Sequence, residues 1–238
     1  MDHLTMSYGV IATLVIIALL FDFMNGFHDA ANSIATIVST RVLKPFQAVI
    51  WASAFNFLAY FLFHLTVAKT IGKGTVDPAI VDHYIIFGAL IGAIIWNIVT
   101  WYYGIPSSSS HALIGGLLGA ALAKVGFSGQ IMSGVLKIIA FIFIAPLLGF
   151  VIGGSLMVIV SWLCRRMPGR KVDKYFRRLQ LLSAAAYSLG HGGNDAQKTV
   201  GIIWMLLVAA GISQATDVEP PGWVVLSCYS AMGIGTMF

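Results

Sequence analysis

Long apolar stretches, separated by short polar ones, dominate the chain. A membrane-spanning helix needs about 20 mostly apolar residues, so stretches without Asp, Glu, Lys or Arg mark where such helices are expected. The apolar stretches cover residues 3–21 with a continuation to 40, then 45–68, 83–123, 138–164, 179–212 with a polar island at 191–199, and 223–238. The pattern predicts an all-α polytopic membrane protein whose first apolar run is retained structure and not a signal peptide.

Three of these stretches carry signals for irregular helices. The segment 83–123 is long enough for two spans or for one deep hairpin, with a break at 104–106. Pro146 is expected to kink its helix, because proline removes a backbone donor. Gly192 and Gly193 are expected to unwind the helix over 179–212, since glycine in a helix interior is unfavourable by about 1 kcal/mol.

Composition and charge agree with a membrane protein. Of the 238 residues, 58% are hydrophobic and 10% are charged, whereas soluble domains have about 45–50% and about 25%. The net charge of +5 does not indicate a nucleic-acid partner, because half of the 14 basic residues lie between 165 and 178. The positive-inside rule predicts that this loop is cytoplasmic and that the acidic linker at 213–221 lies outside. Cys164 and Cys228 indicate neither a metal site nor a disulfide framework.

Two polar islands resemble each other at an offset of 166 residues. The first reads Gly-Phe-His-Asp-Ala-Ala-Asn-Ser over 26–33, and the second reads Gly-Gly-Asn-Asp-Ala-Gln-Lys-Thr over 192–199. The expected topology sends the two islands through the membrane in opposite directions. Inverted repeats with polar, glycine-broken segments at matching places are typical of secondary transporters. The sequence therefore predicts inverted repeats with a site between them.

The first island also forms a polar face. Its polar residues recur at spacings of three and four, which keeps them within an arc of about 80° on a helix. They are Asp22, Asn25, Asp29, Asn32 and Thr36. An aspartate at mid-bilayer is unfavourable by about 2.5–3.5 kcal/mol, so this face is expected to line a cavity or to meet a partner helix. Asp29 is the stronger functional candidate, whereas Asp22 is equally well explained as a satisfied structural group.

The second island and a serine motif offer groups for an anion. Lys198 follows Asp195 by three residues and is expected either to pair with it or to contact an anion directly. The motif Pro-Ser-Ser-Ser-Ser-His over 106–111 has residues that favour a helix start. Its hydroxyls and free amides are expected to converge on one point, where a helix dipole attracts an anion. For His111, carrying a proton and bonding a carbonyl are equally good interpretations.

These motifs resemble the inorganic phosphate transporter (Pit) family, which carries a Gly-x-Asn-Asp-type signature in both inverted halves and a Pro-x-Ser-x-Ser/Thr-His signature after each. Three motifs occur here in the family's order, and the resemblance extends over nearly the whole chain. It implies an inverted-repeat secondary transporter with broken helices, with a first repeat at 1–164, a basic cytoplasmic loop at 165–178 and the beginning of a second repeat at 179–238. It implies symport of inorganic phosphate with H+ or Na+ across the cell membrane, without enzyme activity or a resident cofactor.

The resemblance also implies roles for the polar motifs. The islands would bind cation and phosphate, and the serine motif would hold the phosphate. The expected ligands are Asn25, Asp29, Asn32, Ser107, Ser108, Ser109, Ser110, His111, Asn194, Asp195, Lys198 and Thr199. A coupling sodium ion would be held by Asp29, Asn32, Asn194 and Asp195.

Two departures from the family's pattern matter. His28 stands where the family often has Asn, which favours proton over sodium coupling. The second serine motif would lie beyond Phe238. The second repeat is therefore expected to be incomplete, either in a fragment or in a truncated gene product.

Other interpretations stay open at this point. Sulfate or another oxyanion would suit hydroxyls and amides, although Asp29 or Asp195 could accept the hydrogen of a protonated phosphate. A non-transporting scaffold or channel is the alternative from another class. An intramembrane aspartyl protease could use the same two aspartates, but Asp195 follows Gly-Gly-Asn, and the serine motif would then have no role. A homo-oligomer and a divalent metal carried with phosphate also stay open.

Overall fold

The computed structural model describes residues 7–214 and 219–238, which form helices and, among these residues, no β-strand. The α-helices are α1 (Tyr8–Ser39), α2 (Pro45–Leu58), α3 (Thr66–Gly74), α4 (His83–Tyr102), α5 (Ser109–Val125), α6 (Met132–Cys164), α7 (Gly169–Ala209) and α8 (Gly222–Met237). Short 3-10 turns lie at Ala59–Phe61, Pro78–Ile80 and Gly126–Gly129. The first six residues and Asp217 of the acidic linker lie outside the described residues.

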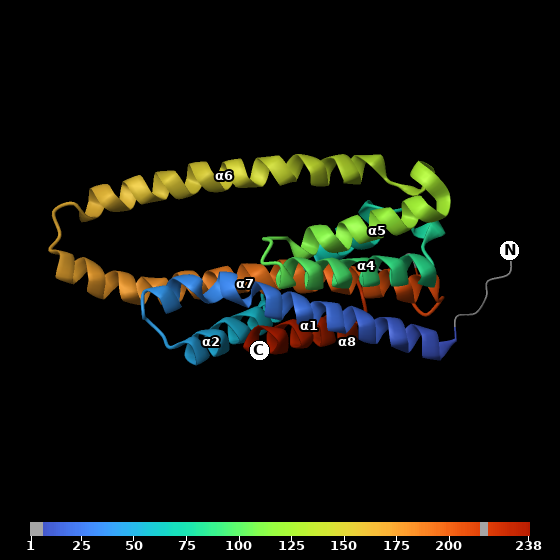
Figure 1. Ribbon diagram of the computed structural model, residues 1–238, viewed down its shortest axis with the longest axis horizontal. Helices are drawn as coiled ribbons and strands as arrows, with labels where there is room; N and C mark the ends of the chain where they lie inside the picture. Colours follow the sequence, from blue (N-terminus) through green and yellow to red (C-terminus); the bar gives the residue numbers. More distant parts are fainter. Residues whose placement is uncertain (1–6, 215–218) are drawn as a thin grey trace.

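Four helices are long and apolar enough to cross a membrane, on length and composition: α1, α4, α5 with the 3-10 turn that follows it, and α6. Figure 1 shows that α6 stands apart from the other helices, and none of its residues is buried within the described part of the chain. A helix that is apolar all round and unburied suits a lipid environment. α6 runs through Pro146 without a break. The predicted all-α polytopic class is confirmed.

The two islands lie on helices that pack in an inverted arrangement. α1 and α7 lie side by side and run in opposite directions (Figure 1). Each then packs against a helix of the other half, α1 against α8 and α7 against α2. A Cβ on Gly26 would overlap the Met232 carbonyl oxygen of α8, and a Cβ on Gly192 would overlap the Asn56 carbonyl oxygen of α2. Glycines that let backbones approach closely are common where membrane helices pack, and here both islands use them at matching positions.

α7 is one continuous helix of 41 residues, so the prediction that it unwinds at Gly192 and Gly193 is wrong. Gly192 admits the backbone of α2, and Gly193 admits the ring of Phe63, whose Cδ2 would lie 2.7 Å from an added Cβ. Both glycines therefore serve close packing, which offsets their low helix propensity.

The segment 165–178 is only partly a loop. The turn at 165–168 is followed directly by α7, which begins at Gly169. Asp173 and Arg177, one helical turn apart, form an ion pair of 3.1 Å. The basic residues therefore lie around the junction of α6 and α7, beyond the ends of α1 and α2 in Figure 1.

The stretch 45–68, expected as one helix, is interrupted. After α2 and a 3-10 turn, residues 62–65 are not helical, and α3 begins at Thr66. The interrupted segment contains neither glycine nor proline, so local propensity does not predict the break. Hydrogen bonds from α7 meet its backbone instead.

α4 and α5 form a hairpin whose tip lies inside the bundle. The predicted break at 104–106 is part of the turn between them, where Gly104 has a φ of 64° that favours glycine. The tip stops beside the middle of α7 (Figure 1), where Ser110 contacts Asp195. The hairpin therefore carries the start of α5 to the second island.

Candidate functional site

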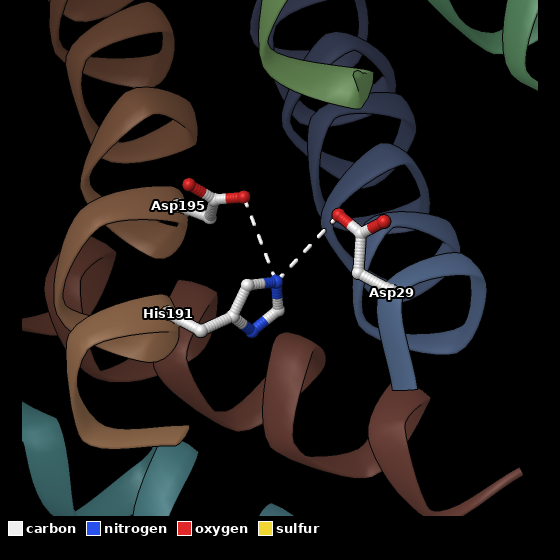
Figure 2. A group of neighbouring side chains, drawn as sticks. All are labelled: Asp29, His191 and Asp195. Atoms are coloured by element: carbon white, nitrogen blue, oxygen red, sulfur yellow. Dashed lines mark ion pairs between the residues drawn. The ribbon is translucent and has the colours of Figure 1, made fainter. Parts of the chain in front are cut away.

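Two aspartates from the inverted helices meet at one imidazole. The Nε2 atom of His191 lies 3.6 Å from Oδ2 of Asp29 on α1 and 3.6 Å from Oδ2 of Asp195 on α7 (Figure 2). The three side chains are only 10–13% exposed. One ligand atom from each lies within 4.8 Å of the others, a geometry that could hold a cation. The two candidates that the sequence placed 166 residues apart are thus neighbours.

A hydrogen-bond relay orients the imidazole. Thr236 of α8 donates to the Met232 carbonyl at 2.9 Å, and it accepts from the Asn56 amide nitrogen at 2.8 Å. The Asn56 amide oxygen then faces Nδ1 of His191 at 3.4 Å, so Nδ1 is the donor. In the neutral imidazole the lone pair is therefore on Nε2, which points toward both carboxylates. Among the described residues Nε2 has no hydrogen-bond partner, and a proton or a metal cation would complete this arrangement.

Lys198 joins the cluster from one turn further along α7. Its ammonium contacts both the Asp195 carboxylate and the Ser110 hydroxyl. The Ser110 oxygen also lies 3.5 Å from each oxygen of Asp195. Of the two interpretations of Lys198, the structure contains the ion pair. The serine at the start of α5 thus reaches the second island directly.

The first island contributes neutral groups around Asp29. The Asn32 amide donates to Oδ1 of Asp29 at 3.5 Å, and Nδ1 of His28 lies 3.4 Å from the same oxygen. Asn25 is buried and interacts with the Asp195 carboxylate of the opposite helix. The predicted polar face therefore meets a partner helix at Asn25 and Asp29, whereas Asn32 is exposed.

Asp22 and Thr199 form a separate buried pair. The Thr199 hydroxyl donates to Oδ1 of Asp22 at 2.9 Å, and both side chains are inaccessible to solvent. The thiol of Cys228 lies beside the same carboxyl group. Thr199 thus contacts Asp22 and does not face the cluster around His191, although the sequence grouped it with Asp195.

The four serine hydroxyls do not converge on one point, contrary to the prediction. Ser107 accepts from the Trp96 indole at 2.9 Å, and Ser108 caps α5 by accepting from the His111 amide at 3.3 Å. Ser109 is buried. Only Ser110 reaches Asp195, because α5 begins at Ser109 and successive side chains on a helix point about 100° apart.

Ser107, Ser108 and His111 instead line a groove of about 370 Å³ between α4 and α5, together with Trp96. His111 is exposed there.

Asn194 also departs from its predicted role. It is exposed and donates to the Gly190 carbonyl of its own helix at 2.9 Å. It therefore does not join Asp29 and Asp195, and the four-residue sodium site predicted from the sequence does not form around it. The continuous helix explains this, because Asn194 precedes Asp195 by one residue and points to another side of α7.

Sequence reasoning missed His191 and Asn56 as site residues. One signal could have found His191, since the offset of 166 residues pairs it with Asn25 of the predicted polar face. Asn56 carries no such signal, because its place depends on how α2 packs against α7 and α8. Asn97 of α4 was missed as well. It is buried, and its amide has no hydrogen-bond partner among the described residues.

Comparisons with known proteins agree with this fold and site. Residues 25–238 match the phosphate transporter family. A probable low-affinity inorganic phosphate transporter of Rhizobium meliloti (strain 1021) is 56% identical over 98% of this chain and 70% of its own length. A protein of the same description from Bacillus subtilis (strain 168) is 49% identical over 94% of this chain and 67% of its own length.

Among solved structures, one described as the sodium-dependent phosphate transporter has a TM-score of 0.78 at 21% identity, and the match covers 97% of this chain and 75% of that one. It shares the fold. The relatives are described as transporters and not as enzymes, which confirms that prediction. The motifs, the inverted packing and the match over residues 25–238 lead to one conclusion: the chain belongs to the phosphate transporter family.

Proposed function

We propose that this protein carries inorganic phosphate across the cell membrane by alternating access, in symport with a cation. The observation that carries the proposal is the cluster in which Asp29 and Asp195, from inverted helices, meet at His191 with Lys198 beside them. Ionisable groups inside a membrane protein mark ion and substrate pathways. Sites between inverted repeats are where secondary transporters bind their substrates.

The cluster suits a coupling proton. Nε2 of neutral His191 directs its lone pair at two carboxylates, so a proton on Nε2 would turn repulsion into two charge-assisted contacts. A sodium ion held by the carboxylates of Asp29 and Asp195 is the second candidate. It is favoured by the structural relative, which is described as sodium-dependent, and by the preference of alkali and alkaline-earth cations for oxygen ligands over imidazole.

Phosphate would bind at Lys198 and Ser110. In the structure both groups are engaged with Asp195. When a cation neutralises Asp195, the ammonium and the hydroxyl become available to an anion at the start of α5. This order of events would make phosphate binding depend on the cation, which is the requirement for symport.

Uptake of radiolabelled phosphate into proteoliposomes tests the proposal, with imposed proton or sodium gradients in separate arms and sulfate as the competing anion. We expect phosphate uptake in the proton arm, and we expect His191→Gln to abolish its dependence on the proton gradient. Uptake in the sodium arm alone would replace the coupling ion. Uptake of sulfate in place of phosphate would overturn the substrate, and no uptake of either anion by folded protein would overturn the transport function.

A further inference from the structure

The break at 62–65 lies against a stripe of α7 that faces away from the site cluster. Gly193, Gln197 and Gly201 recur at every fourth residue and so share one face of the helix. Gly193 receives the ring of Phe63. A Cβ on Gly201 would lie 2.9 Å from the carbonyl oxygen of Ala68. The non-helical segment and the first turns of α3 are therefore seated on this stripe.

Gln197, at the centre of the stripe, bonds to both sides of the break. Its amide oxygen accepts from the backbone amides of Val67 and Ala68 at 3.0 and 3.5 Å. Its amide nitrogen donates to the His64 carbonyl at 2.9 Å. The side chain is 1% exposed, so these bonds lie in the interior, where an unmade hydrogen bond is unfavourable by about 1–3 kcal/mol.

The position of Gln197 corresponds to that of a helix cap supplied from another helix. The N-cap residue of α3 is Leu65, which makes no side-chain capping bond among the described residues. A capping side chain normally accepts from the second or third amide of the helix. Those amides belong to Val67 and Ala68, the two that Gln197 accepts from.

We propose that Gln197 is a positioning residue that caps α3 across the bundle and ties the break at 62–65 to the helix that carries Asp195 and Lys198. The inference rests on the proposed function for its consequence: movement of α7 during transport is transmitted to the break through this side chain. The break is then a joint of the transport cycle whose backbone stays satisfied inside the membrane.

Hydrogen exchange measured by mass spectrometry on the full chain in detergent tests the cap. We expect Gln197→Met to accelerate exchange in the segment 62–70 about tenfold. The matched control is Gln180→Met on the same helix, where the exposed side chain contacts only Thr40 among the described residues. Adding Leu65→Ser to Gln197→Met supplies a local cap and should restore slow exchange at the start of α3.

Phosphate uptake tests the positioning role. Gln197→Met should lower the maximal rate about tenfold while the KM for phosphate stays near that of the parent, and Leu65→Ser should recover part of the rate. Unchanged exchange in Gln197→Met would overturn the cap, as would failure of Leu65→Ser to restore protection or, for an unfolded variant, folding. Faster exchange with an unchanged rate would overturn the positioning role. If the parent itself takes up no phosphate, the proposed function fails, while the exchange experiment still decides the cap.

Discussion

The two islands place an aspartate at the same point of two inverted helices, Asp29 on α1 and Asp195 on α7. One turn before and one turn after it, α1 carries neutral amides, whereas α7 carries an imidazole and an ammonium group. The corresponding pairs are Asn25 with His191 and Asn32 with Lys198. The glycines that seat each island on its neighbouring helix are shared. The comparison teaches that the scaffold is duplicated, while the cationic groups of the site come from one repeat.

The shared scaffold gives the largest expected effect. Gly192→Ala should lower stability by about 3 kcal/mol, because the new methyl group would meet the backbone of α2, which cannot yield as a side chain can. Gly26→Ala should have a similar effect against α8. Gly190→Ala is the matched control on α7, since an added Cβ there meets nothing within 4 Å in the described part of the chain. Unfolding in detergent measures all three, and equal stability of Gly192→Ala and Gly190→Ala would contradict the packing argument.

The unshared charge gives the next effect. Lys198→Asn makes the second island resemble the first and leaves Asp195 without its ammonium partner. We expect the KM for phosphate to rise about tenfold, the change produced by losing roughly 1.4 kcal/mol of binding free energy. Lys171→Asn, near the exposed start of α7, is the control. Uptake at varied phosphate concentration separates KM from the maximal rate, and an unchanged KM would remove Lys198 from the phosphate site.

The base of the hairpin, remote from both islands, should show the smallest effect. Lys124 of α5 lies 2.8 Å from Oδ2 of Asp82, which caps α4. Partial burial favours the neutral acid, but the Lys124 ammonium and the Ile85 amide outweigh it and lower the pKa of Asp82. Because the pKa is lower in the folded state, the pair stabilises the protein above the usual pKa of aspartate. That stabilisation is lost as the pH falls through the folded-state pKa.

Lys124→Met should therefore reduce stability by no more than about 1 kcal/mol at neutral pH, since both side chains are partly exposed. The difference from the parent should shrink when the pH falls below about 4. Unfolding at several pH values measures this, and a difference that grows on acidification would have the wrong sign.

How much the sequence predicts differs between these regions. Asp29 and Asp195 stand out because charged groups are rare on an apolar background, and their offset exposes the inverted repeat. The break at 62–65 could not be predicted, because its cause is Gln197, which lies more than 130 residues away in the chain. Gly192 and Gly193 were misinterpreted for a related reason. Helix propensity is local, whereas their role is to admit α2 and Phe63.

The serine motif shows the same limit. The sequence correctly predicts a helix start near Ser109, but which hydroxyl faces the site depends on how α5 is rotated against α7. That rotation is set by packing, and it selects Ser110.

The central claim is that the two islands form one phosphate transport site. The most direct measurement compares phosphate uptake into proteoliposomes by the parent, Asp29→Asn, Asp195→Asn and the control Asp173→Asn, whose exposed carboxylate pairs with Arg177. The account predicts uptake at the level of empty liposomes for both island variants and parental uptake for Asp173→Asn. Parental uptake by either island variant would show that its aspartate is not part of the site.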